Sequence, residues 1–118
     1  MNKDEEENMR IYREQNNKIN LFQQKDYNDV SYWMLDNLIL PAKTHKKFVW
    51  SDMIVIEMKR RIKMLINSKS QEKVFEKISK KKYSKDNIAD LLRKLSVNVL
   101  EEIYVELMKN DKPKANKV

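Results

Sequence analysis

The chain has 118 residues, enough for one domain of ordinary size, and its formal net charge is +7. Glycine and cysteine are both missing. Phosphate-cradling loops, dinucleotide fingerprints and nucleophile elbows need glycine, while disulfides and cysteine-based zinc sites need cysteine, so the composition excludes these sites. The longest apolar run, residues 38–40, is far shorter than a membrane span, and residues 4–7 are acidic where a signal peptide would be basic. We expect a soluble, intracellular protein.

The segment over residues 1–26 is rich in Asn, Gln and charge and holds few apolar residues. Such a composition buries too little apolar surface to offset the entropy lost when the chain becomes ordered. We therefore expect a flexible polar N-terminal arm, disordered or marginally helical, that is dispensable for folding.

The rest of the chain has the periodicity of helices, with apolar residues every three or four positions. The first predicted helix spans residues 29–40, and Pro41 ends it. The other predicted helices span residues 51–67, 70–82, 85–95 and 97–109. A serine is expected to cap each of these four helices. These serines are Ser51, Ser70, Ser84 and Ser96.

The predicted fold is all-α, a small helical bundle without a sheet, because hairpin turns of the primed types lose their favoured residue when glycine is missing. The expected domain covers residues 27–110, and a basic flexible tail covers residues 111–118. The inward-facing side chains are expected to be large and apolar, except for one asparagine. They are Val30, Trp33, Met34, Asn37, Leu38, Ile54, Met58, Ile62, Leu65, Val74, Phe75, Ile78, Ile88, Leu91, Leu92, Leu95, Val99, Leu100, Ile103 and Leu107.

Positive charge dominates the C-terminal part of the sequence. Residues 1–40 hold 5 Lys and Arg against 8 Asp and Glu, whereas residues 41–118 hold 20 against 10. A compact body with this excess attracts polyanions, of which nucleic acid is the commonest inside cells. The candidate nucleic-acid-binding residues lie on three successive predicted helices. They are Lys59, Arg60, Arg61, Lys63, Lys73, Lys77, Lys80, Lys81, Lys82, Lys85, Arg93 and Lys94.

Two interpretations of these basic residues stay open. They could neutralise phosphates if their faces converge, or they could solvate the outer faces of helices. The chain has 20 Lys and 5 Arg, which favours non-specific phosphate contacts over bidentate reading of guanine.

Other residues with possible chemistry have a simpler structural explanation. Trp33 and Trp50 are expected in the core rather than stacked on single-stranded bases. The seven methionines fill the core first and form an adaptable interface second. His45, the one histidine, is expected to be a solvated surface residue. Because the sequence shows no convergent set of His, Asp and Glu, we expect no enzyme activity, no metal and no cofactor.

The C-terminal region resembles a helix-turn-helix unit. Residues 87–92, the short link 95–97 and the helix 98–109 are similar to its second and third helices. Trp50, Ser51 and Asp52 resemble the start of a Myb/SANT-type, homeobox-like repeat, which would cover residues 48–110. A small basic protein of this kind is similar to the accessory subunits of the ciliate DNA N6-adenine methyltransferase complex. This resemblance implies DNA binding or assembly beside larger catalytic subunits, in the nucleus.

The sequence therefore predicts a non-catalytic, DNA-binding accessory subunit that contacts duplex phosphates and larger protein subunits, with no membrane and no small-molecule substrate as partners. The alternative is a helical protein-interaction module. In that alternative the Met- and Trp-containing region 28–66 docks a partner, and the lysines only solubilise the protein.

Overall fold

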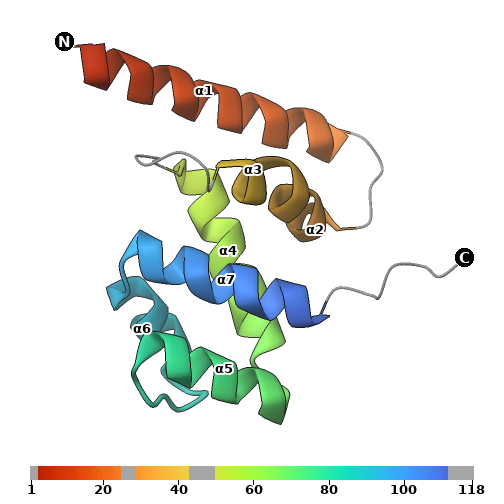
Figure 1. Cartoon of the computed structure of the whole chain (residues 1–118), viewed down its shortest axis with the longest axis vertical. Helices are drawn as coiled ribbons and strands as arrows, with labels where there is room; N and C mark the ends of the chain where they lie inside the picture. The colour runs from red at the N-terminus through yellow and green to blue at the C-terminus, as the bar shows by residue number, and fades with distance from the viewer. Residues whose placement is uncertain (1–2, 25–28, 43–49, 112–118) are drawn as a thin grey trace, which may run out of the picture. The chain divides into compact units, whose positions relative to one another are not determined.

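The computed structural model describes residues 3–24, 29–42 and 50–111, and the regular elements of these ranges are all helices (Figure 1). The prediction of an all-α protein is confirmed for this part of the chain, which contains no strand. The chain divides into two compact units, Met1–Glu57 and Met58–Val118. This boundary lies between residues 57 and 58, inside the helix Asp52–Leu65. The predicted tail lies outside the described residues except for Asp111.

The first unit begins with the 22-residue helix α1, Lys3–Gln24. Acidic side chains occupy its first turn, where they interact favourably with the helix dipole. Three side chains at spacings of four and three residues are buried: Gln15, Ile19 and Phe22. Residues 3–24, which we expected to be disordered or marginally helical, form one helix, in which Ile19 and Phe22 are buried and Gln15 adds a buried hydrogen bond.

A second run of helical turns follows in the first unit, made of α2 (Val30–Met34), the π-helix η1 (Leu35–Ile39) and α3 (Leu40–Ala42). The Asp29 side chain caps it and accepts from the Ser31 N–H at 2.9 Å. The prediction that Pro41 ends this helix is wrong, since the turns continue through Ala42. A wider π turn, in which the Leu40 N–H bonds the carbonyl five residues back, precedes the proline.

The π turn also changes which side chains are buried in this run. Asn37, expected to face inward, is exposed, and its Nδ2 donates to the Trp33 carbonyl at 3.0 Å. Trp33 is half-buried and packs on Phe22 of α1, with ring centroids 4.8 Å apart. Met34 and Leu38 are buried as predicted, and Leu35 and Ile39 are buried as well.

Helix α4, Asp52–Leu65, buries Ile54, Met58 and Ile62 at the predicted four-residue spacing. The predicted side-chain cap by Ser51 is wrong, because its buried Oγ has no hydrogen-bond partner among the described residues. The Ser51 backbone serves the helix start instead. Its carbonyl accepts from Ile54 and Val55 at 3.1 Å, and its N–H donates to Gln15 Oε1 at 2.6 Å.

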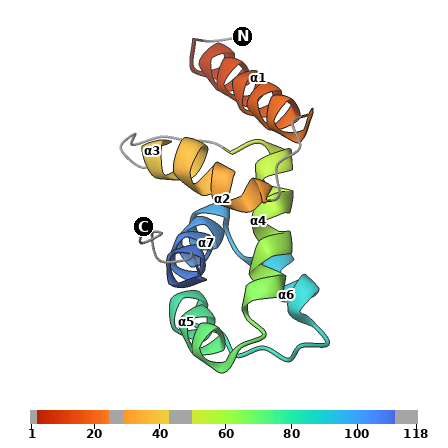
Figure 2. The ribbon, with the colours of Figure 1, turned by 90° about the vertical axis from the view of Figure 1, so that its right-hand side faces the viewer.

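The second unit contains α5 (Lys69–Ser79), α6 (Ile88–Lys94) and α7 (Val97–Asp111). Helices α5 and α7 lie side by side (Figure 2), and Gln71 Nε2 on α5 donates to the Leu107 carbonyl on α7 at 3.0 Å. The large buried side chains of these helices form the core. They are Phe75, Leu92, Leu100, Ile103, Tyr104, Val105, Leu107 and Met108.

The caps of these three helices differ from prediction at two of three positions. Ser68, not Ser70, caps α5 and accepts from the Gln71 N–H. Asn87, not Ser84, occupies the N-cap of α6. Ser96 does cap α7, because its Oγ accepts from the Val99 N–H at 3.3 Å. Helix α5 ends earlier than expected, at the left-handed Lys80, and α6 begins later, which leaves a longer non-helical connection between them.

Candidate nucleic-acid interface

The positive charge belongs to the second unit. Residues 58–118 hold 17 Lys and Arg against 8 Asp and Glu, a net charge of +9, whereas residues 1–57 hold 8 against 10, a net charge of −2. All twelve predicted nucleic-acid-binding residues fall in the second unit. The candidate interface therefore consists of residues of this unit alone.

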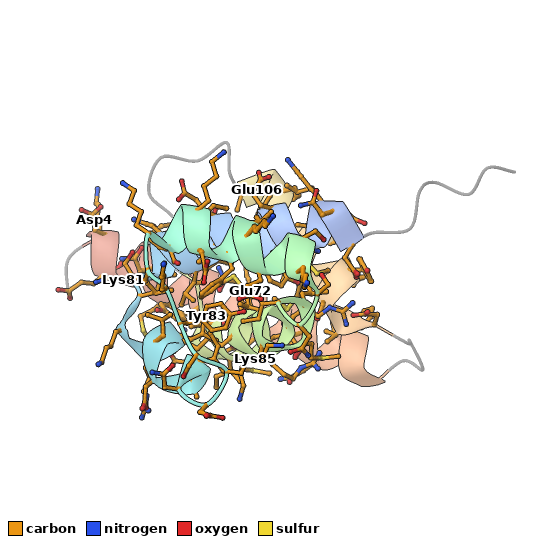
Figure 3. The ribbon with its side chains drawn as sticks, turned by 90° about the horizontal axis from the view of Figure 1, so that it is seen from below. Asp4, Glu72, Lys81, Tyr83, Lys85 and Glu106 are labelled. Carbon is orange, nitrogen blue, oxygen red and sulfur yellow. The ribbon has the colours of Figure 1, made fainter. Side chains whose placement is uncertain are left out.

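Residues 80–87, which join α5 to α6, form what we call the lysine connector. Four of its lysines, Lys80, Lys81, Lys82 and Lys85, are exposed. Figure 3 labels Lys81 and Lys85 on this connector, with Tyr83 between them in the sequence. This is the densest group of exposed cations in the described part of the second unit.

A tight turn at the end of α5 starts the connector. Lys80 adopts a left-handed conformation, with φ of 59°, and its N–H bonds the Glu76 carbonyl at 2.9 Å. The buried Ser79 hydroxyl then accepts from the Lys81 N–H and donates to the Lys81 carbonyl, both at 3.3 Å. These bonds fix the backbone from which the first three lysines project.

Tyr83 anchors the middle of the connector. Its hydroxyl donates to the Ile66 carbonyl at 3.2 Å, and its ring packs edge-on against the buried Phe75, with centroids 5.0 Å apart. Burial, and to a smaller degree the charges of Glu72 and Glu76, raise the pKa of the Tyr83 hydroxyl. The hydroxyl therefore stays protonated at neutral pH and keeps its donor role. The tyrosine holds the connector on the core while its lysine neighbours face water.

The end of the connector is held by Ser84 and Asn87. The N–H and the hydroxyl of Ser84 both donate to Asn87 Oδ1 at 3.1 Å, and the Asn87 N–H donates to the Ser84 carbonyl. The expected N-cap role of Ser84 is wrong for this reason, since its side chain bonds within the connector.

The remaining predicted residues have different surroundings. Lys73 and Lys77 are exposed four residues apart on α5, which leads into the connector. Arg93 pairs with Asp90 on α6, and the neighbouring Lys94 is exposed. On α4, Arg61 is half-buried and its Nη2 lies 3.4 Å from an Asp111 carboxylate oxygen. We assign no phosphate contact to the three other basic residues of α4, which are Lys59, Arg60 and Lys63.

Arg61 is therefore a structural link between α4 and the end of α7, a role that its place in a run of basic residues does not predict. Tyr83 was also missed as a positioning residue. The available signal was an aromatic residue inside a run of charge, residues 80–85, where a solvated loop would have little use for a ring.

Helix α7 would be the recognition helix of a helix-turn-helix unit, and one face of it is packed in the core. Six of its residues are buried, and its exposed positions include Glu102 and Glu106. Carboxylates repel phosphates, so this exposed face is poorly suited to the major groove. Lys109 is an exposed cation near its C-terminal end.

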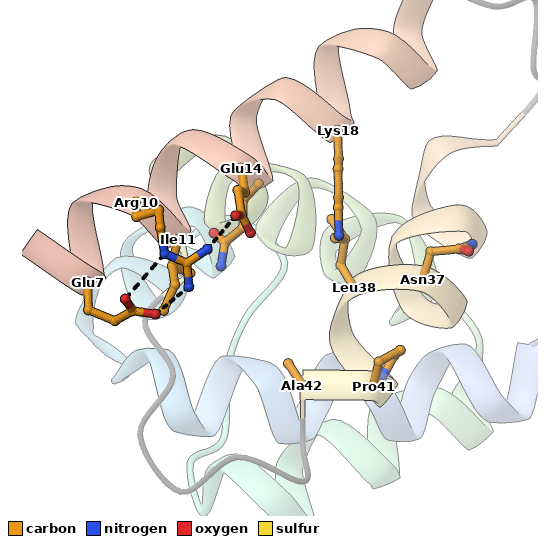
Figure 4. A pocket seen from close by; sticks show the side chains of 10 residues that line it. Glu7, Arg10, Ile11, Glu14, Lys18, Asn37, Leu38, Pro41 and Ala42 are labelled. Carbon is orange, nitrogen blue, oxygen red and sulfur yellow. Dashed lines mark hydrogen bonds and ion pairs between the residues drawn. The ribbon is translucent and has the colours of Figure 1, made fainter.

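The first unit has a hollow of about 430 Å³ between α1 and residues 37–42 (Figure 4). Arg10, on its rim, pairs with both Glu7 and Glu14. The hydrogen bond from Arg10 lowers the pKa of Glu7, and the Glu7 and Glu14 carboxylates raise the pKa of Arg10. Glu7 is thus ionised at neutral pH and unsuited to donate a proton as a general acid.

Within residues 3–24, 29–42 and 50–111, no group of three or more His, Asp or Glu side chains could hold a metal ion. His45 lies outside the described residues. None of the described helices is both long and apolar enough to cross a membrane.

Compared with known proteins, the chain matches no family model, no curated protein and no solved structure. The function of the chain is therefore inferred from the residues of its second unit.

Proposed function

We propose that the second unit binds duplex DNA through phosphate contacts made by the lysine connector and by Lys73 and Lys77 of α5, without catalysing a reaction. The observation that carries this proposal is the connector itself. Four exposed lysines lie within residues 80–85 on a backbone fixed by Tyr83 and Ser79. Cations held in place lose less entropy when they meet phosphates than cations on a mobile loop.

The side-chain chemistry supports contacts that do not depend on sequence. Lysine is a compact point charge that contacts phosphate readily, whereas bidentate reading of guanine favours arginine. The exposed glutamates of α7 lead us to assign no base reading to that helix. Of the homeobox-like arrangement, the proposal keeps one feature. Helix α7 follows α6 across the short link at Leu95 and Ser96.

The resemblance to ciliate accessory subunits adds a biological role to the proposal. In this role the protein brings duplex DNA to the larger catalytic subunits of a nuclear complex, in particular a DNA adenine methyltransferase complex. The chain would supply affinity through counterion release, and the partner would supply the chemistry.

The test compares two variants that lose the same charge. Replacing Lys73, Lys77 and Lys81 with Gln should weaken binding to duplexes of several sequences equally, and should reduce the slope of log affinity against log salt by up to about 2.7, since each contact contributes about 0.9. The matched control replaces Lys3, Arg13 and Lys18, exposed cations of α1, with Gln.

The control variant should keep the slope of the unchanged chain. An equal loss of salt slope in both variants would mean that net charge alone drives binding. An unchanged DNA affinity in the variant with Lys73, Lys77 and Lys81 replaced would refute the proposed interface. Thermal melts of both variants check that the substitutions leave the fold intact.

A second candidate function, the protein-interaction module, has one observation in its favour. On α4 the side chain of Ile56 is 66% exposed and that of Met64 is 51% exposed, which is unusual for large apolar residues. Among the described residues of region 28–66, other large side chains are buried, including those of Met34, Trp50 and Met58. Replacing Ile56 and Met64 with Ser should abolish association with a protein partner and leave the DNA affinity unchanged if this candidate is correct.

A further inference from the structure

Ser84 has a chemical setting that the proposed function does not use. It is exposed, and residues 80–84 before and including it are outside any helix. Lysines stand two, three and four positions before it and one position after it. Ser79, by contrast, is buried, and Ser68 and Ser70 lie at the start of α5, with one lysine between them.

This setting fits the active site of a serine kinase with an acidic substrate groove. Kinases take their substrate segment as an extended strand, so no helix has to unwind at residues 80–84, while the Tyr83 anchor and the bonds between Ser84 and Asn87 have to open. Acidic groups in the groove pair with cations that precede the acceptor serine. The side chains of Lys80, Lys81 and Lys82 are exposed and able to make these pairs.

We propose that Ser84 is a phosphorylation site for a serine kinase that selects basic residues before its acceptor, and that the phosphate switches off DNA binding by the lysine connector. The switch rests on the proposed function, whereas the modification itself does not. Tyr83 is not the acceptor in this scheme, because its side chain is half-buried and its ring packs against Phe75, whereas Ser84 is exposed.

The transfer changes one bond on the acceptor. The Ser84 Oγ attacks the γ-phosphorus of ATP, an Oγ–P bond forms, and the bond from that phosphorus to the β–γ bridging oxygen breaks, so ADP leaves with the electron pair. The hydroxyl proton goes to the general base of the kinase. The hydroxyl bond to Asn87 Oδ1 is lost, while the bond from the Ser84 N–H to the same oxygen can remain.

The product carries a charge of about −1.5 to −2 among four lysines. That charge offsets about half of the positive charge of the connector, and its oxygens compete with DNA phosphates for the same ammonium groups. The loss of about two phosphate contacts should reduce the salt slope by about 1.8 and lower the affinity about tenfold or more at moderate salt.

The first arm of the experiment locates the modification. The full chain is incubated with ATP and the catalytic subunit of cyclic-AMP-dependent protein kinase, a kinase that selects basic flanks, and phosphate is mapped by mass spectrometry. We expect phosphate on Ser84 and its loss from this position in Ser84→Ala. The rate should fall in a variant with Lys81 and Lys82 replaced by Gln. No incorporation, or phosphate mainly on Ser68, Ser70 or Ser96, would overturn the assignment.

The second arm measures the effect on binding. A full chain with phosphoserine incorporated at position 84 is compared with the unchanged chain in a salt series with duplex DNA. A chain with phosphoserine at position 70, outside the connector, is the matched control and should lose less of the slope. An unchanged slope with phosphoserine at 84 would overturn the switch and leave the proposed function standing. If the unmodified chain has no salt-sensitive affinity, the proposed function fails, while the first arm still decides the modification site.

Discussion

Lys80 is the only residue in the described part of the chain with a positive φ, at 59°. A residue with a Cβ loses about 1 kcal/mol or more in this left-handed conformation, and glycine is the usual residue at such a helix end. The chain has no glycine, so it carries this strain at the first lysine of the connector. The turn it produces directs the next residues away from the axis of α5.

Replacing Lys80 with Gly should raise the free energy of unfolding by about 0.5–1 kcal/mol, because the substitution removes the strain. The matched variant Lys77→Gly removes the same charge from the interior of α5. It should lower the free energy of unfolding by about 1 kcal/mol, because glycine is unfavourable inside a helix. Chemical denaturation of the two variants measures both effects. A loss of stability in Lys80→Gly would contradict the left-handed assignment.

Tyr83 makes the stability of the fold depend on pH in the alkaline range. Its pKa in the folded protein is raised above the ordinary value of 10.0, chiefly by burial and then by Glu72 and Glu76. A group with a raised folded-state pKa contributes its full stabilisation below the unfolded pKa, and that contribution is lost as the pH rises through the folded pKa.

The unfolding free energy of the unchanged chain should therefore decline above about pH 10 more steeply than that of Tyr83→Phe. The phenylalanine variant keeps the ring contact with Phe75 and removes only the hydroxyl. At pH 7 it should be less stable by about 1 kcal/mol because the Ile66 carbonyl loses its donor. Denaturation series at pH 7 and pH 10.5 give both quantities, and parallel pH profiles would show that Tyr83 does not titrate as argued.

At the scale of elements, α1 is held to the first unit by a polar contact. Gln15 is 3% exposed, and its Oε1 accepts from the Ser51 N–H at the start of α4. A buried backbone N–H without a partner costs about 1–3 kcal/mol. This bond explains why a segment with few apolar residues is still packed, and it predicts that the segment contributes to stability.

Gln15→Ala should accordingly lower the free energy of unfolding by about 1–3 kcal/mol, while Asn17→Ala, a truncation at an exposed position of the same helix, should change it by less than about 0.5 kcal/mol. Thermal melts of the full chain and the two variants measure the difference. Equal midpoints for all three would mean that α1 is the independent arm that the composition suggests.

Periodicity predicted the helices better than it predicted their ends. The spacing of Ile54, Met58 and Ile62 was enough to identify α4, because burial on one face leaves a regular pattern. The rule that a serine before an apolar run caps a helix succeeded at Ser96 and failed at Ser51, Ser70 and Ser84. At Ser84 a local competitor determined the bonding of the serine, because its hydroxyl donates to Asn87 Oδ1. Helix α5 begins after Ser68, two residues before Ser70. Spacing alone shows the candidate caps but not which of them the helix uses.

For the same reason, the sequence could predict only part of the candidate interface. The list of basic residues was readable from the sequence, because charge needs no structure. Which of them share one fixed segment depends on the left-handed turn at Lys80 and on the anchor at Tyr83. Arg61 illustrates the converse, since its partner Asp111 is fifty residues away in the chain and draws it into a structural ion pair.

At the scale of the whole molecule, the net charge of +7 conceals two units of opposite sign. The second unit carries +9 and the first −2, so a polyanion is attracted to one part of the chain and not to the other. This asymmetry also explains why the control variant of the binding test belongs in α1. There the same loss of charge occurs in the unit to which no phosphate contact is assigned.

The central claim is that the lysine connector binds duplex phosphates, and a salt series on the full chain tests it most directly. With four connector lysines each contributing about 0.9, log affinity should fall linearly with log salt with a slope of about −3.6 or steeper. Replacing Lys80, Lys81, Lys82 and Lys85 with Gln should remove most of that slope. An affinity that does not respond to salt, or a slope that survives the four substitutions, would contradict the claim.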